Sequence, residues 1–217
     1  MNTYQSTTRT KPTAWHLISL LFHPLAMPLW AVALVVLCNA TSVRYVAELK
    51  PFVIWSVAGM TLVTPLLFWT VLRGFGIVGQ GSRSGPLGEN VRRQRVLMLV
   101  ATELCLVGCG AVFAKFMMLF VVRKVLYTAA VVVLVLMIME YLWPLNYHLV
   151  AVGALLAVEW VLLYVGNVAL LWPFVATIVV AGVLWSAQLH LAKLPPKQIC
   201  WSLPLGLAVG MVTFMLL

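Results

Sequence analysis

The stretch from residue 168 to residue 190 reads VALLWPFVATIVVAGVLWSAQLH and contains no Asp, Glu, Lys or Arg. An α-helix needs about 20 apolar residues to cross the hydrocarbon core of a bilayer, and this stretch is long enough. Six further stretches of the same kind fill most of the chain. We place the seven spans near residues 16–38, 52–72, 96–113, 125–143, 148–165, 168–190 and 199–217. These unbroken runs lack the alternating pattern of a membrane β-barrel, so the sequence predicts an all-α, polytopic transmembrane helical bundle of about seven spans.

The composition of the whole chain agrees with a membrane protein. Hydrophobic residues make up 64% of the 217 residues, charged residues make up 9%, and the mean hydropathy is +1.06. Because a soluble domain carries about 25% charged residues, this composition excludes a water-soluble fold. We expect residues 1–15 to form a polar tail and residues 16–217 to form a single transmembrane helical domain. The first apolar stretch is too long for the apolar core of a secretory signal, so we expect it to be retained.

The formal net charge of +9 reflects the loops between the spans. Basic residues are enriched in the cytoplasmic loops of membrane proteins, and an N-terminus in the cytoplasm places the larger group of Lys and Arg residues there. That group comprises Arg9, Lys11, Arg73, Arg83, Arg92, Arg93, Arg95, Lys193 and Lys197. We therefore predict a cytoplasmic N-terminus and no nucleic-acid partner. An all-helical bundle indicates a bacterial inner membrane rather than an outer one.

Two acidic residues lie deep inside predicted spans. Glu103 lies about two turns into the third span, and Glu159 lies in the middle of the fifth span. Because an ionisable group in the hydrocarbon core is costly and rarely faces lipid, we expect both side chains to point into the bundle. Hydrogen bonding between helices is the simpler role for them. A proton relay or a substrate site is the alternative role.

Two histidines mark span ends at one predicted membrane face. His148 begins the fifth span and His190 ends the sixth. Two histidines lack the further ligands that a metal site needs, and no HExxH-type spacing occurs, so we predict no metal and no other cofactor. The basic residues at the same predicted face are Arg95, Lys193 and Lys197. Together these side chains suit a phosphate group at the level of the lipid headgroups.

Several short segments are informative through their order and spacing. FHPLAMP occupies residues 22–28, TLVTP occupies residues 61–65, and further matches continue with gaps to about Gly206. In this order the segments resemble the type 2 phosphatidic acid phosphatase superfamily, whose members are helical-bundle lipid phosphatases. Arg95 looks like the Arg of the first motif, and His148 looks like the His that ends the second motif. The resemblance implies a phosphatase-like core of six helices.

The third motif of that superfamily is changed here at the positions that matter for chemistry. Ser186 is retained, whereas Gln188, Leu194 and Gln198 stand at the places of the Arg, the His and the acidic residue. In active members that His is the nucleophile and the Arg binds the phosphoryl oxygens. Leucine cannot act as a nucleophile and glutamine carries no charge. The resemblance therefore implies a relative that has lost the family mechanism.

These observations predict an integral membrane protein that resembles the phosphatases, lacks their catalysis and binds the headgroups of anionic lipids. The expected headgroup-binding residues are Arg95, His148, Lys193 and Lys197. The alternative is a lipid phosphate or polyprenyl phosphate phosphatase with a modified site, for which His148 and His190 are the candidate catalytic residues. A transporter or a subunit of a membrane complex is a further alternative, to which the two intramembrane acids would be relevant.

The expected partners are membrane lipids, and the last span adds a surface for another helix. Gly206 and Gly210 form a GxxxG step, and such small residues let a second helix approach closely. Packing against another helix of the same bundle is the first interpretation of this step. Homo-oligomer or hetero-oligomer formation is the second.

Overall fold

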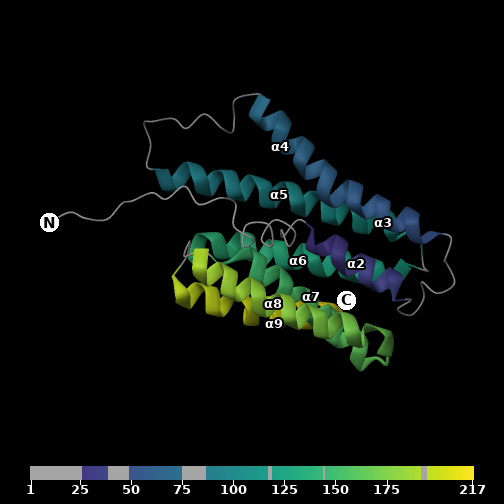
Figure 1. The fold of residues 1–217 in the computed structure, drawn as a ribbon. Coiled ribbons are helices and arrows are strands. Elements are labelled where there is room, and N and C mark those ends of the chain that lie inside the picture. The colour runs from purple at the N-terminus through teal and green to yellow at the C-terminus, as the bar shows by residue number, and fades with distance from the viewer. Residues whose placement is uncertain (1–25, 39–48, 75–86, 117–118, 144, 192–194) are drawn as a thin grey trace, which may run out of the picture.

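The described part of the chain is entirely helical. The structure, a computed structural model, describes residues 26–38, 49–74, 87–116, 119–143, 145–191 and 195–217, and every regular element in these ranges is a helix (Figure 1). Six of the helices are long and apolar enough to cross a membrane, and a shorter apolar helix, Met27–Leu37, accompanies them. The prediction of an all-α transmembrane bundle is confirmed.

Each predicted span overlaps described helices, and several of these helices begin earlier than predicted. The elements are α2 (Met27–Leu37), α3 (Lys50–Ala58), the π-helical turn η3 (Gly59–Val63), α4 (Thr64–Gly74), α5 (Leu87–Phe113), α6 (Phe120–Leu142), α7 (Tyr147–Tyr164), the 3-10 turn η5 (Val168–Leu170), α8 (Leu171–Leu191) and α9 (Pro196–Leu216). Of the first predicted span, the structure describes the part from residue 26. The predicted tail 1–15 lies outside the described residues.

Several helices begin with residues that favour helix starts. Proline occupies one of the first two positions in three helices, Pro28 in α2, Pro51 in α3 and Pro196 in α9. At these positions the missing backbone N–H would have no partner within the helix. Asn146 precedes α7, and its side-chain oxygen accepts a hydrogen bond of 3.3 Å from the backbone N–H of Leu149. Asn146 is therefore the N-cap of α7 and fixes where this helix begins.

A π-helical turn joins α3 and α4 into one continuous helix. The turn spans Gly59–Val63, and Thr64 follows it directly. The hydroxyl of Thr64 donates a hydrogen bond of 3.1 Å to the carbonyl of Gly59, five residues earlier. Pro65 follows directly and has no backbone N–H to donate to the preceding turn. A π-bulge and a proline are two recognised causes of helix bending. Figure 1 shows α4 diverging from α5 as it runs away from α3.

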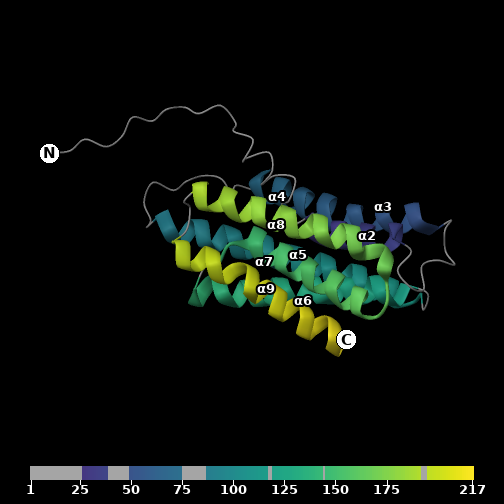
Figure 2. The ribbon, with the colours of Figure 1, turned by 60° about the horizontal axis from the view of Figure 1, so that its bottom comes forward.

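The central helix of the bundle is α7. Every residue from Leu149 to Glu159 is buried, and the neighbouring helices are α2, α6, α8 and α9. Figure 2 shows α7 inside the bundle, with α8 and α9 on either side of it. A helix that is apolar all round is expected to be buried on all sides, so α7 provides the core around which the other helices are arranged.

Glycines bring the backbones of α7 and α9 together. A Cβ atom added at Gly206 would overlap the carbonyl oxygen of Val150, and one added at Gly153 would overlap the backbone of α9. At Gly210 the added atom would lie 2.9 Å from the Cα atom of Ala154, which is also too close. The GxxxG step of the last helix therefore packs inside the bundle, against α7.

Candidate functional site

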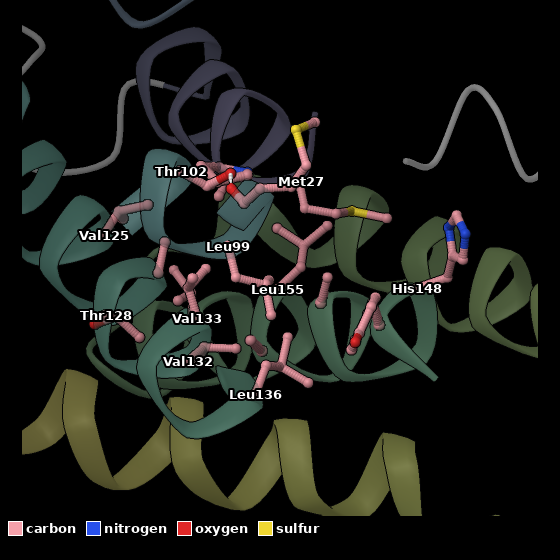
Figure 3. Close-up of a pocket in the computed structure, with 18 of the residues that line it drawn as sticks. Met27, Leu99, Thr102, Val125, Thr128, Val132, Val133, Leu136, His148 and Leu155 are labelled. Carbon is pink, nitrogen blue, oxygen red and sulfur yellow. Dashed lines mark hydrogen bonds between the residues drawn. The ribbon is translucent and has the colours of Figure 1, made fainter. Parts of the chain in front are cut away.

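A cavity of about 350 Å³ lies between α2, α5, α6 and α7 (Figure 3). Its volume falls within the range of ligand pockets, roughly 300–1,000 Å³. Aliphatic side chains form most of its wall. The side chains of α7 that line it are Tyr147, His148, Ala151, Ala154, Leu155 and Val158.

The cavity runs along the helix axes. On α7 its lining extends from Tyr147 to Val158, and on α6 it extends from Leu136 back to Val125, which is eleven steps along the helix in each case. At 1.5 Å per residue, each of these stretches is about 16 Å long. Figure 3 shows His148 at one end of the cavity and Val125 at the other. The cavity is thus long enough for a stretch of extended aliphatic chain.

One end of the cavity is polar. Arg95 begins the apolar part of α5 and Tyr147 begins α7, so both residues lie where a membrane span starts. Together with His148 they form the end of the lining that we call the cavity mouth. Deeper in the cavity, the polar lining residues are Thr102 and Thr128. The site is therefore amphipathic, with charge at one end and aliphatic walls along the rest of its length.

The carboxylate of Glu140 on α6 contacts two residues of the cavity mouth. Arg95 Nη1 lies 3.4 Å from Glu140 Oε1, and the hydroxyl of Tyr147 donates a short hydrogen bond to Glu140 Oε2. The side chain of Glu140 is 4% exposed, whereas that of Arg95 is 49% exposed. Glu140 therefore connects α5, α6 and α7 at this end of the bundle, and it offsets the charge of Arg95.

Glu140 was not among the site residues predicted from the sequence. The residue lies in the last turn of α6, and Arg95 lies where the apolar part of the preceding helix begins. Consecutive membrane helices run antiparallel, so the end of one comes close to the start of the other. That relation is a signal that could have paired these two residues from the sequence.

A second polar cluster ties α7, α8 and α9 together at the same end. The side-chain amide of Asn146 donates a hydrogen bond of 2.9 Å to Gln188 Oε1, and the backbone N–H of Asn146 donates one of 2.9 Å to the hydroxyl of Ser202. All three residues are buried. A buried polar group is costly unless it is hydrogen-bonded, so this cluster stabilises the bundle only as a complete set.

The predicted headgroup-binding residues are placed unequally. Arg95 and His148 line the same cavity. Lys197 is exposed in the first turn of α9 and is not among the residues that line this cavity. Lys193 and the side chain of His190 lie outside the described residues. The structure thus brings two of the predicted residues together.

The two intramembrane acids differ in their surroundings. Glu159 is 2% exposed, and its Oε1 accepts a hydrogen bond of 3.0 Å from the hydroxyl of Thr177 on α8. This contact is the interhelical hydrogen bond expected as the simpler role of Glu159. Glu103 is half-buried. One carboxyl oxygen of each residue is buried and has no hydrogen-bond partner among the described residues.

Comparison with family models, with curated proteins and with solved structures found no match. The resemblance to the lipid phosphatases therefore depends on the sequence motifs alone. Within the described residues, no group of three or more His, Cys, Asp or Glu side chains is arranged to hold a metal ion.

Proposed function

We propose that this protein is a non-catalytic membrane protein that binds an anionic phospholipid, with the phosphate at the cavity mouth and one acyl chain inside the cavity. The observation that carries the proposal is the amphipathic cavity itself. Its lining is about 16 Å long and mostly aliphatic, and Arg95 and His148 lie at one end of it. A phospholipid has the same arrangement, with its phosphate at one end and an acyl chain beyond it.

The absence of catalysis is proposed from the third motif. Leu194 stands at the position of the nucleophilic His of the resembled phosphatases, and a leucine side chain forms no covalent intermediate. Gln188 stands at the position of their Arg, and it accepts a hydrogen bond from Asn146 inside the bundle. This role of Gln188 is structural and does not require a phosphoryl group.

The experiment that tests the proposal measures lipid binding by the full-length protein in detergent. Displacement of a fluorescent phosphatidylglycerol would be compared for the wild type, Arg95→Gln and Arg92→Gln. Arg92 lies on the same helix, where its guanidinium packs 4.1 Å from the centre of the Tyr141 ring, and it is not part of the cavity lining. Arg95→Gln should weaken binding about tenfold or more, because charge-assisted hydrogen bonds to phosphate are lost, and Arg92→Gln should leave it within about twofold.

Two results would contradict this proposal. Equal losses in the two variants would show that the lipid is attracted by the basic surface in general and not by the cavity mouth. Release of inorganic phosphate from phosphatidate by the wild type, lost in His148→Ala, would instead favour a phosphatase with a modified site.

A further inference from the structure

We infer that Glu140 is a specificity-determining residue of this lipid site, and that it favours phosphodiester headgroups of single negative charge over phosphomonoesters of nearly double charge. The inference rests on the proposed lipid site. It deepens that proposal, because it names the chemical class of the headgroup.

The ion pair between Arg95 and Glu140 has one fixed partner and one movable partner. The separation of 3.4 Å between Arg95 Nη1 and Glu140 Oε1 exceeds the roughly 2.7–2.9 Å of a tight charge-assisted hydrogen bond. Glu140 is buried and is also held by the hydroxyl of Tyr147, whereas half of the Arg95 side chain is exposed. The carboxylate is therefore the fixed partner, and the guanidinium is the group that can turn toward a ligand.

The Arg95 guanidinium has more donors than the contact with Glu140 uses. A guanidinium has five N–H donors in a planar fork, and the contact with Glu140 involves one Nη atom. Arg95 can therefore contact a phosphate at the cavity mouth while it stays close to Glu140. The bound phosphate then shares Arg95 with a carboxylate that cannot move away.

The charges of Arg95 and Glu140 determine which headgroup the site favours. Arg95 and Glu140 together carry no net charge, so the attraction between Arg95 and a phosphate is opposed by repulsion from Glu140. A phosphodiester brings one negative charge, whereas a phosphomonoester carries about −1.5 to −2 at neutral pH. The attraction to Arg95 and the repulsion from Glu140 both grow with the charge of the phosphate, whereas the cost of withdrawing the phosphate from water rises more steeply with its charge. With Glu140 present, the neutral pair supplies little net attraction to offset that cost. Glu140 therefore disfavours the phosphomonoester.

The test compares two lipids with identical acyl chains, phosphatidylglycerol and phosphatidate, on the full-length protein in detergent, with phosphatidylcholine as the headgroup of no net charge. The wild type should bind phosphatidylglycerol more tightly than phosphatidate. In Glu140→Gln the amide oxygen still accepts from Tyr147, but the negative charge is gone. We expect the affinity for phosphatidate to rise about tenfold and that for phosphatidylglycerol to rise less, so that the preference is lost or reversed.

The control variant is Glu103→Gln, which makes the same change from acid to amide on α5 at a residue that does not line the cavity. It should leave the ratio of the two affinities unchanged. A wild type that prefers phosphatidate would overturn the inference, even if Glu140→Gln does not fold. So would a Glu140→Gln variant in which both affinities change by the same factor. A wild type that binds neither anionic lipid better than phosphatidylcholine would instead contradict the proposed function itself.

Discussion

The two sides of α7 are packed in opposite ways. Toward α9, the backbones lie so close that no Cβ atom fits at Gly153 or Gly206. Toward α2, α5 and α6, the same helix borders a cavity of about 350 Å³. Both sides belong to a single helix of 18 residues. General looseness of the bundle therefore does not explain the cavity.

We expect the side of α7 that faces α9 to contribute to stability and the side that faces the cavity to contribute to binding. Protein interiors are close-packed, and large voids are few in a domain. On the cavity side the small residues Ala129 and Ala151 line the wall, where larger apolar side chains would fill the space. We therefore expect substitutions on the α9 side to change the free energy of unfolding and substitutions on the cavity side to change lipid binding.

The largest expected effect is at the contact between α7 and α9. Gly206→Leu places a side chain against the backbone of Val150, so the two helices must separate, and overpacking of this kind costs about 3 kcal/mol or more. The matched control is Gly182→Leu on α8, where an added Cβ meets nothing within 4 Å. Chemical unfolding in detergent measures both variants. Similar stabilities would mean that the α7 and α9 backbones are not in close contact.

The next effect is at the side of α7 that faces α8. Glu159→Lys places a charge among buried groups and should destabilise the protein by about 2.5 kcal/mol. Glu159→Gln keeps an oxygen that accepts from Thr177 and should cost about 1 kcal/mol. The unfolding free energies of the two variants test this order. Equal losses would indicate that Glu159 contacts water.

A smaller effect is expected where α7 begins. Asn146→Ala removes the N-cap and the hydrogen bond to Gln188, which should cost about 1–2 kcal/mol. Asn167 is a useful control, because it precedes the turn η5 and makes no capping hydrogen bond with its side chain. Asn167→Ala should change the unfolding free energy by about 0.5 kcal/mol or less. A loss at Asn167 as large as that at Asn146 would show that the buried cluster contributes little.

The smallest effect on stability should come from the cavity side. Ala151→Phe projects a ring into the cavity and should change the unfolding free energy by less than about 1 kcal/mol, because the added volume meets space. This variant should nevertheless fail to bind the fluorescent phosphatidylglycerol. A variant that binds the lipid like the wild type would show that the acyl chain lies elsewhere.

Hydropathy predicted the membrane helices well, and it failed where helices continue beyond the apolar runs. The start of α5 at Leu87 lies before the predicted start at residue 96, because its first turns are polar and carry no membrane signal. The start of α6 at Phe120 was missed because Arg123 and Lys124 interrupt the apolar run. Both cations lie about 5 Å from the centre of the Phe120 ring, a contact that only the folded helix makes.

The candidate site was predicted in part. Arg95 and His148 were identified because they lie at the same predicted membrane face and match two motifs of the resembled phosphatases, and the structure places both in one cavity. Glu140 was missed, because its pairing with Arg95 follows from the antiparallel arrangement of α5 and α6 and not from its own segment. The cavity was not predictable from hydropathy either. Its existence depends on the rotation of four helices about their axes, and the apolar pattern of a fully buried helix such as α7 leaves that rotation undetermined.

The length of the cavity has a consequence for the sidedness of the membrane. A lining of about 16 Å that starts at a membrane face reaches roughly the middle of a hydrocarbon core about 30 Å thick. A lipid bound there would belong to one leaflet, the one that contains Arg95. The occupancy of the protein would then follow the composition of that monolayer alone, so that moving the same lipid to the opposite monolayer would empty the site without changing the total lipid content.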